Sequence, residues 1–533
     1  MRHQAQERPE LVIALVCPLG VRIDVLETDI CDELQKFGYD CERIQLSGLL
    51  KNLDLWEPDK DEREETRISH RQRCAFEFRR GGGADAMARA AIAVIRERRM
   101  ARSGDPDKPA NSCAYVLRQL KRPEEVELLR DVYGQSVVVV GGHAREQTRI
   151  EALADTIAQK NGKASSAEFK NDAERLIHID EKENHPDDED AKLGQNTRDT
   201  YPLADCFVSL EHGASDGVRR FIRLMFGHPS ETPTPDEMAM YQANAIALRS
   251  SDERRQVGAV IVKRTKRSDS SNIADADIVA SGMNEVPRRQ GGFYWNGESP
   301  DGRDPALRQR SQGVDLEDRI KADVIGEILQ RLKRYKWLAP EYLALDDTEL
   351  NARGTKLVPL LKRTQFTDIS EFMRQVHAEM AALVDAAKRG TAVRGCEMYV
   401  TTFPCHNCAK HIIAAGITRV IYLEPYPKSR AEMLHRDEIV LGPTEPHAVG
   451  DRVLFVPFSG IAPRQYARLF RMADRGKKYG LRLDEWERKK RDLYPREILR
   501  NSHLAYTRAE REELDKLPAD YSWDRERLSP AKQ

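Results

Sequence analysis

Two short stretches decide the fold of this chain: His377-Ala378-Glu379 and, after 24 intervening residues, Pro404-Cys405-His406-Asn407-Cys408. One imidazole and two thiolates supply three corners of a tetrahedral zinc site, and a site with three protein ligands leaves the fourth corner for water. We therefore predict Zn²⁺ as the cofactor, with His377, Cys405 and Cys408 as its ligands. Glu379 follows His377 too closely to bind the same ion comfortably, but it can reach the bound water and is the predicted catalytic residue.

Each half of this pattern also has a more ordinary interpretation. A C-x-x-C alone occurs in redox pairs and in half of a structural zinc finger, and an H-x-E alone can begin a solvated helix. Together, in this order and with apolar segments around them, they are typical of zinc-dependent nucleobase deaminases. His406, His411 and Cys396 lie nearby in sequence, and we expect them to be surface or packing residues.

The elements around the two motifs predict an α/β domain over residues 236–480. Within it, residues 287–367 form a charged stretch with one convincing helix at 316–335, which we interpret as an insertion. Residues 481–533 are strongly charged and predict a surface helix and a loose C-terminal extension. The remaining expected helices are 236–249, 369–387 and 404–415, and the expected strands are 257–262, 277–281, 398–403, 419–423 and 453–457.

The first part of the chain, residues 1–228, predicts a second α/β domain with a parallel sheet. Its clearest strand is the continuous apolar run at residues 11–16, as expected of a strand buried on both faces. A loop containing Pro18, Leu19 and Gly20 follows, where α/β proteins hold phosphate at a helix N-terminus. Further expected elements are helices at 21–37, 84–99 and 123–133, strands at 41–46, 114–117 and 137–140, and an acidic loop at 178–192.

The loop after the first strand departs from a working phosphate-binding loop, G-x-x-x-x-G-K-[ST]. Leu15 stands at the first glycine, and Val21-Arg22 replace the lysine and the hydroxyl residue. ATP hydrolysis is therefore disfavoured. Regulatory nucleotide binding and a purely structural role both remain open for this domain.

Composition excludes some classes of protein. Lysine plus arginine (86) nearly equal aspartate plus glutamate (87), and aromatic residues make up 7%, which argues against a protein that coats nucleic acid. The nine cysteines follow no disulfide framework and predict reduced thiols. No apolar segment is long enough to cross a bilayer, so we expect a soluble, cytoplasmic protein without membrane partners.

The second half resembles the deoxycytidylate deaminase family. The resemblance is carried by Ser250-Ser251-Asp252, Gln256 to Val262, Ser281-Gly282-Met283-Asn284, Val376 to Met380 and Thr402 to Lys410. It implies a cytidine-deaminase-like α/β/α fold and a sugar-binding role for Asn284, although asparagine also caps turns. Arg374, Lys428 and Arg255 are candidates for binding the substrate phosphate, or they are solvated surface charges.

Taken over most of its length, the chain resembles the bacterial anti-phage dCTP deaminases, in which a degenerate phosphate-loop domain precedes a deaminase domain. Lys121 to Val126 and Pro425 to Ser429 contribute to this resemblance. It implies conversion of dCTP, and also dCMP, to the uracil nucleotide, with depletion of a DNA precursor during infection. A regulatory nucleotide, RNA or protein inhibitor and a homo-oligomer are expected partners. The alternatives are a housekeeping dCMP deaminase, a polynucleotide cytidine deaminase and an inactive nucleotide sensor.

Overall fold

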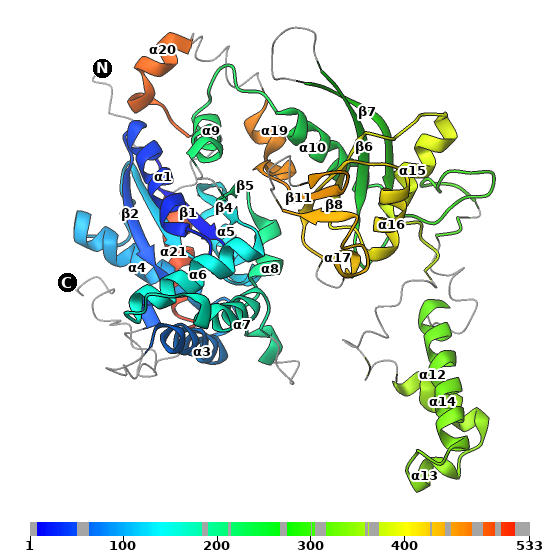
Figure 1. Cartoon of the computed structure of the whole chain (residues 1–533). Helices are drawn as coiled ribbons and strands as arrows, with labels where there is room; N and C mark the ends of the chain where they lie inside the picture. Colours follow the sequence, from blue (N-terminus) through cyan, green and yellow to red (C-terminus); the bar gives the residue numbers. More distant parts are fainter. Residues whose placement is uncertain are drawn as a thin grey trace. The chain divides into compact units, whose positions relative to one another are not determined.

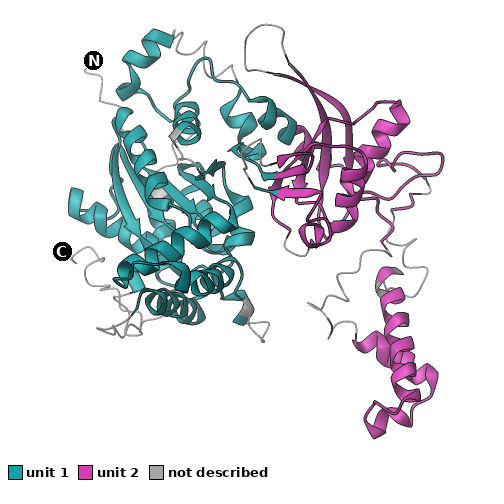
Figure 2. Ribbon diagram, in the orientation of Figure 1, with its two compact units in different colours: residues 1–241, 441–445, 456–533 teal, residues 242–440, 446–455 magenta. Residues whose placement is uncertain are grey.

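The computed structural model describes residues 8–50, 63–183, 190–211, 215–266, 274–299, 301–303, 316–357, 361, 373–426, 429–442, 449–471, 483–495 and 503–517. The chain forms two compact units (Figure 2). Unit 1 contains residues 1–241, 441–445 and 456–533, and unit 2 contains residues 242–440 and 446–455. The chain thus leaves unit 1, builds unit 2 and returns. The boundaries that we expected at residues 228–236 and 481 stay predictions about domains.

Unit 1 is built on a six-stranded sheet in the order β12-β5-β4-β1-β3-β2 (Figure 1). The β1, β3, β2, β4 and β5 strands pair in parallel, and the short β12 pairs antiparallel with β5. The predicted parallel α/β fold is confirmed. All residues of β1 and β4 are buried, as a sheet covered on both faces requires. The strands are β1 (Leu11–Val16), β2 (Asp40–Gln45), β3 (Cys113–Arg118), β4 (Val137–His143), β5 (Cys206–Ser209) and β12 (Gly460–Ile461).

Helices cover this sheet. The α1 and α9 helices pack together, and their apolar residues join the strands in one buried cluster. The helices of the first segment are α1 (Ile23–Lys36), α2 (Leu46–Leu49), α3 (Glu64–Gly82), α4 (Ala86–Ser103), α5 (Pro123–Tyr133), α6 (Glu146–Lys160), α7 (Lys170–Glu181), α8 (Thr197–Thr200) and α9 (Ser215–Met225).

One expected loop of unit 1 is partly helical. We predicted a loop over residues 178–192, but α7 continues to Glu181, and residues 184–189 lie outside the described part of the chain. Asp180 is 2% exposed and accepts hydrogen bonds from the Leu19 N–H and the Thr197 hydroxyl. A buried aspartate needs hydrogen-bond partners, and the sequence does not show them. Asp180 was therefore assigned to a loop.

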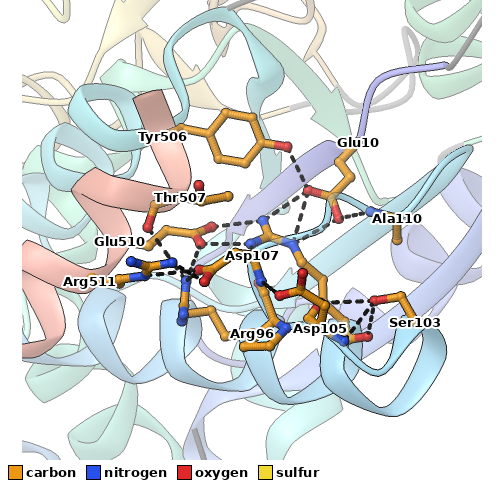
Figure 3. Close-up of polar contacts among 12 residues, drawn as sticks. Glu10, Arg96, Ser103, Asp105, Asp107, Ala110, Tyr506, Thr507, Glu510 and Arg511 are labelled. Atoms are coloured by element: carbon orange, nitrogen blue, oxygen red, sulfur yellow. Dashed lines mark hydrogen bonds and ion pairs between the residues drawn. The ribbon is translucent and has the colours of Figure 1, made fainter. Parts of the chain in front are cut away.

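The C-terminal segment belongs to unit 1 and is more deeply packed than we predicted. It contains α19 (Tyr466–Leu469), α20 (Leu483–Arg488) and α21 (His503–Leu514). Trp486 is 1% exposed and packs edge-on against Phe37. Glu510 of α21 is fully buried and binds Arg99, in a network that also includes Glu10 and Arg96 (Figure 3). The expected surface helix is therefore only half right for α21: Glu510 is paired in the interior, whereas Arg508 and Glu512 on the same helix are exposed.

Unit 2 contains a second six-stranded sheet in the order β10-β11-β9-β8-β6-β7. The β6 and β7 strands form an antiparallel hairpin, β6 pairs antiparallel with β8, and β8 pairs in parallel with β9. The strands are β6 (Gly258–Lys266), β7 (Ala274–Met283), β8 (Glu397–Thr402), β9 (Arg419–Glu424), β10 (Ile439–Leu441) and β11 (Val453–Pro457). The hairpin strands extend into the polar stretch 263–276, which we had expected to be loop, because alternate residues there face solvent.

Helix α15 (Ala378–Arg389) packs on the sheet of unit 2 against β7 and β6. The contact is close at Gly282, where a Cβ atom would lie 2.3 Å from the Ala382 nitrogen and 2.5 Å from the Ala378 oxygen. We predicted this helix over residues 369–387. It begins only at Ala378, because Val376 pairs with Glu285 in a β-bridge and His377 is the N-cap.

The remaining helices of unit 2 include the one predicted in the insertion. It is α12 (Leu316–Arg334), which packs against α14 (Asp347–Leu357) beyond the short α13 (Pro340–Leu343). The others are α16 (His406–Ala414) and α17 (Ala431–Leu434), while α10 (Pro235–Ala247) spans the end of unit 1 and the start of unit 2. In the part of the chain that the structure describes, no helix has the length and apolar character needed to span a membrane.

Candidate metal centre

Two helix N-termini of unit 2 bring the predicted zinc ligands together. His377 is the N-cap residue of α15 and Cys405 is the N-cap residue of α16, while Cys408 lies in the first turn of α16. Each N-cap residue has an extended backbone, so its side chain leaves the helix axis and faces the other helix. The positive end of each helix dipole favours thiolates at this place.

The geometry of the three side chains fits a zinc ion. Their ligand atoms all lie within 4.8 Å of one another. The His377 Nδ1 atom is 3.4 Å from Cys405 Sγ and 3.3 Å from Cys408 Sγ. A nitrogen and a sulfur bound to one tetrahedral zinc ion lie about 3.6 Å apart, given the usual bond lengths. The predicted cofactor is confirmed, since among the described residues this is the cluster that can hold a metal.

Glu379 lies beside the ligands in the first turn of α15 and is 4% exposed. Its carboxyl group hydrogen-bonds the Cys408 thiol. Burial raises the pKa of Glu379 to about 7, and the neighbouring Cys405 thiolate adds to the rise. A buried carboxyl group whose pKa is close to neutral can both accept and donate a proton, which is the property of a general acid–base catalyst.

The ligands themselves have perturbed pKa values. Hydrogen bonds with Cys408 and His377 lower the pKa of Cys405 to about 4, which leaves it a thiolate. The contact with Cys405 raises the pKa of His377 to about 9. The pKa of Cys408 is raised by its hydrogen bond with Cys405 and by burial.

Asn284 is 8% exposed and uses its side chain within the protein. Its Oδ1 accepts from the Val257 N–H, and its Nδ2 donates to Asp252 Oδ2 and to the Arg255 carbonyl. The side chain therefore fixes the 252–257 segment to the end of β7. Its role in binding the sugar stays a prediction.

The predicted phosphate contacts are only partly described. Arg255 is half-exposed and forms an ion pair of 3.5 Å with Glu424, at the end of β9. Arg374 is exposed, three residues before His377. Lys428 lies outside the described residues, but its neighbour Ser429 donates a hydrogen bond to the Pro404 carbonyl. This bond holds the 429 end of the loop against the start of the zinc-binding helix.

The third predicted feature, the loop of Pro18, Leu19 and Gly20, belongs to unit 1. The Leu19 N–H donates to Asp180 at 2.9 Å. A Cβ atom at Gly20 would lie 2.4 Å from the Arg149 carbonyl oxygen, so this loop packs tightly against α6. Phosphate binding by the loop stays a prediction.

Asp252 was absent from the predicted site, although it belongs to the Ser-Ser-Asp stretch. It accepts hydrogen bonds from Asn284 Nδ2 and from the Arg254 N–H. It is also close enough to His377 to raise the pKa of that histidine. An aspartate in a turn after a helix is common, so its type and position alone gave no sign of this proximity.

Comparison with known proteins finds a family model that is similar to part of the chain. Residues 233–424 match the family model described as the cytidine and deoxycytidylate deaminase zinc-binding region. This range includes all three ligands and Glu379.

Several relatives match a shorter segment. Deoxycytidylate deaminase of Enterobacteria phage T4 is 43% identical over 56 residues, which are 10% of this chain and 29% of the phage protein. ComE operon protein 2 of Bacillus subtilis is 49% identical over 53 residues, 10% of this chain and 28% of that protein. Deoxycytidylate deaminase of Homo sapiens is 53% identical over 47 residues, 9% and 25% of the two chains. The matched segment thus spans less than a third of each of these relatives.

Among solved structures, dCMP deaminase from cyanophage S-TIM5 in complex with dCMP and dUMP matches 43% of this chain and 99% of that chain, with 20% identity and a TM-score of 0.22. The family match and the His/Cys/Cys geometry agree on the same residues. Residues 233–424, which contain this cluster, are therefore similar to the zinc-binding region of the cytidine and deoxycytidylate deaminases.

Proposed function

We propose that this protein is a zinc-dependent hydrolytic deaminase of deoxycytidine nucleotides. The observation that carries the proposal is the buried carboxyl group of Glu379, which hydrogen-bonds Cys408 beside His377 and Cys405. A metal cluster with a structural role needs no buried carboxyl group at its side, whereas a hydrolytic site needs one to move protons.

The reaction replaces the exocyclic amine of cytosine with oxygen. His377, Cys405 and Cys408 would hold the zinc ion, which would supply a water that is nucleophilic at neutral pH. Glu379 takes a proton from this water and delivers it to the ring nitrogen N3 as the water oxygen bonds to C4. Glu379 then takes the second proton from the new hydroxyl group on C4 and delivers it to the amine, the C4–N4 bond breaks, and ammonia leaves the uracil product.

The substrate in this proposal is dCTP, with dCMP as a second substrate. The proposed phosphate contacts are Arg255, Arg374 and Lys428. Asn284 is the proposed sugar-binding residue, together with the 252–257 segment that its side chain holds in place. A second candidate is a housekeeping dCMP deaminase, because the relatives of phage T4 and Homo sapiens are named deoxycytidylate deaminases. That candidate predicts turnover of dCMP but not of dCTP.

The biological role that we propose is depletion of the dCTP pool in defence against phage. The resemblance of the whole chain to anti-phage dCTP deaminases supports this role, as does a large first unit that the deamination chemistry does not require. A regulatory nucleotide, RNA or protein inhibitor would keep the activity low in uninfected cells.

The test is ammonia release by the purified full-length chain with zinc, offered dCTP, dCMP, cytidine and single-stranded DNA in parallel. The proposal expects turnover of dCTP and dCMP, and none of free cytidine or of deoxycytidine in DNA. Turnover of dCMP alone would support the housekeeping enzyme, and turnover of DNA would support a polynucleotide deaminase. Failure to deaminate any of the four would contradict the proposed function.

A further inference from the structure

A cavity of about 390 Å³ opens in unit 1, apart from the metal centre. It lies at the carboxyl ends of β1, β2 and β3, where its lining includes Leu19, Gln45 and Gln119. Its other walls come from α3, α6 and the end of α7. The carboxyl edge of a parallel sheet is the usual ligand site of open α/β folds, and the volume is in the usual range for small ligands.

Three side chains that line the cavity each carry a buried polar atom without a partner among the described residues. Arg79 of α3 is 2% exposed, and its Nε and Nη2 atoms both bind Glu125 Oε1 at 3.0 and 2.8 Å. Its Nη1 atom is buried and has no hydrogen-bond partner among the described residues. The same holds for the Oε1 atoms of Gln72 and Gln119, which also line the cavity. Buried polar groups normally have partners, so these three atoms indicate a missing ligand.

The lining has the charge and shape for a phosphorylated small molecule. Six cationic side chains line the cavity, against three carboxylates: Arg22, Arg71, Arg79, Arg118, Lys121 and Lys160, and Asp24, Glu64 and Asp180. Outside the lining, Glu125 and Glu27 bind Arg79 and Arg118, which leaves a small positive excess. Apolar walls from Leu46, Leu50 and Met87 suit a flat ring rather than a bare anion.

Two of the donors near the start of α1 are already engaged. The Leu19 N–H, which would face a phosphate at the start of α1, already donates to Asp180. Lys121 is likewise engaged, with its Nζ atom 2.6 Å from Asp180 Oδ1 and 3.0 Å from the Cys17 carbonyl. On the α3 side of the cavity, Arg79 Nη1 is a buried cationic donor without a partner among the described residues, so we place the phosphate there.

We infer that this cavity binds a nucleoside phosphate, with the phosphate on Arg79 Nη1, the sugar hydroxyls on Gln72 and Gln119, and the base against the apolar wall. A guanidinium held by a carboxylate on one edge presents its other edge to a phosphate oxygen without further ordering. The site is distinct from the substrate site of unit 2, and the inference does not depend on the proposed deaminase activity.

The test is calorimetric titration of the full-length chain with AMP, ADP, dTMP, UMP and inorganic phosphate. Arg79→Lys keeps a cation against Glu125 but removes the free Nη1 donor, so it should weaken binding about tenfold. Gln119→Leu should weaken binding several-fold without touching that ion pair. Arg96→Lys is the matched control, because Arg96 is equally buried in an ion pair but does not line the cavity.

Binding of at least one nucleotide that Arg79→Lys weakens, and that Arg96→Lys and the zinc-ligand variant Cys408→Ser leave unchanged, supports the inference. It is overturned if no nucleotide binds the wild type, or if wild type and Arg79→Lys bind equally well. Equal losses in Arg79→Lys and Arg96→Lys would mean a general effect on folding and would also overturn it. Inorganic phosphate that binds as tightly as every nucleotide would overturn the assignment of a nucleoside.

Discussion

Cys408 is the most deeply buried of the three zinc ligands, with 1% of its surface exposed. Serine in its place keeps the size of the side chain, but a hydroxyl stays protonated at neutral pH and is a poor zinc ligand. We expect Cys408→Ser to weaken zinc binding by more than about 100-fold, since even the loss of a supporting group costs 10- to 100-fold. The measurement is zinc content after dialysis against a chelator.

Cys396→Ser is the control for this experiment. Cys396 is also buried, at 2% exposed, but it lies outside the metal cluster. It should retain one zinc ion per chain. A Cys408→Ser protein that retains zinc as well as Cys396→Ser does would mean that the ligands are wrongly assigned.

His143, at the end of β4, predicts how the stability of unit 1 depends on pH. Its Nε2 atom is 2.8 Å from the Ser459 hydroxyl, and burial lowers its pKa from 6.5 to about 4. Between these two pH values, the unfolded chain binds a proton that the folded chain does not. The free energy of unfolding is therefore unaffected by protonation of His143 above pH 6.5. As the pH falls from 6.5 toward 4, protonation of this histidine in the unfolded chain lowers the free energy of unfolding by at most about 3 kcal/mol.

Denaturant unfolding at a series of pH values checks this expectation. The wild type should lose stability between pH 6.5 and 4, and His143→Asn should lose less over the same interval because the variant has no group that titrates there. Identical pH slopes in the two proteins would show that other groups cause the loss.

At the residue scale, the zinc ligands could be predicted because metal chemistry fixes residue types and their spacing. The hydrogen bonds of the Asn284 side chain could not be predicted. Its partners Asp252 and Arg255 precede it by about 30 residues and reach it only when the 252–257 segment closes on β7. Lone polar residues carry no sign of such contacts in the sequence.

At the scale of elements, Gly282 sets the position of α15. A methyl group there would meet the backbone of Ala378 and Ala382 rather than a flexible side chain, so the helix itself would have to move. We expect Gly282→Ala to lower the free energy of unfolding by about 1–3 kcal/mol. It should also lower the deaminase activity, because Glu379 lies in the first turn of the displaced helix.

Gly217→Ala in α9 is the matched control. A Cβ atom at Gly217 would make an ordinary contact of 3.8 Å with Val208, and alanine favours a helix. This variant should be as stable as the wild type or more so. Unfolding curves of the three proteins test the prediction, and an unchanged Gly282→Ala protein would contradict the close packing of α15 on β7.

The sequence predicted elements best where one physical signal dominates. The apolar run at residues 11–16 coincides with β1, and the charged helix expected at 316–335 is α12. The loop expected from residue 178 and the expected start of α15 were wrong because tertiary contacts decide where these two helices end and begin. Asp180 extends α7 by bonding across unit 1, and the bridge between Val376 and Glu285 delays the start of α15.

At the scale of the whole molecule, the return of the chain to unit 1 depends on buried charges. Glu510 of α21 accepts hydrogen bonds of 2.6 and 2.7 Å from Arg99. It also forms an ion pair of 3.1 Å with Arg96 (Figure 3). Glu510→Gln removes a negative charge that neutralises two buried guanidinium groups. We therefore expect the free energy of unfolding to fall by about 3 kcal/mol. Thermal unfolding of the full-length protein measures it.

Glu512→Gln is the control on the same helix. Its ion pair with Arg508 is exposed, with 61% and 81% of the two side chains accessible, and such pairs contribute about 0.5 kcal/mol or less. Equal effects of the two variants would mean that the buried network does not hold α21. The network was not predictable, because Glu510 and Arg99 are 411 residues apart and the segment is as charged as a solvated tail.

The central claim is that the metal centre removes the amino group of a deoxycytidine nucleotide with Glu379 as its proton carrier. The most direct test is ammonia release from dCTP and dCMP by wild type and Glu379→Gln, with zinc content measured in the same preparations. We predict equal zinc content and a rate at least about 100-fold lower in the variant, because general acid–base catalysis contributes that much or more. A variant that binds zinc and deaminates at the rate of the wild type would contradict the claim.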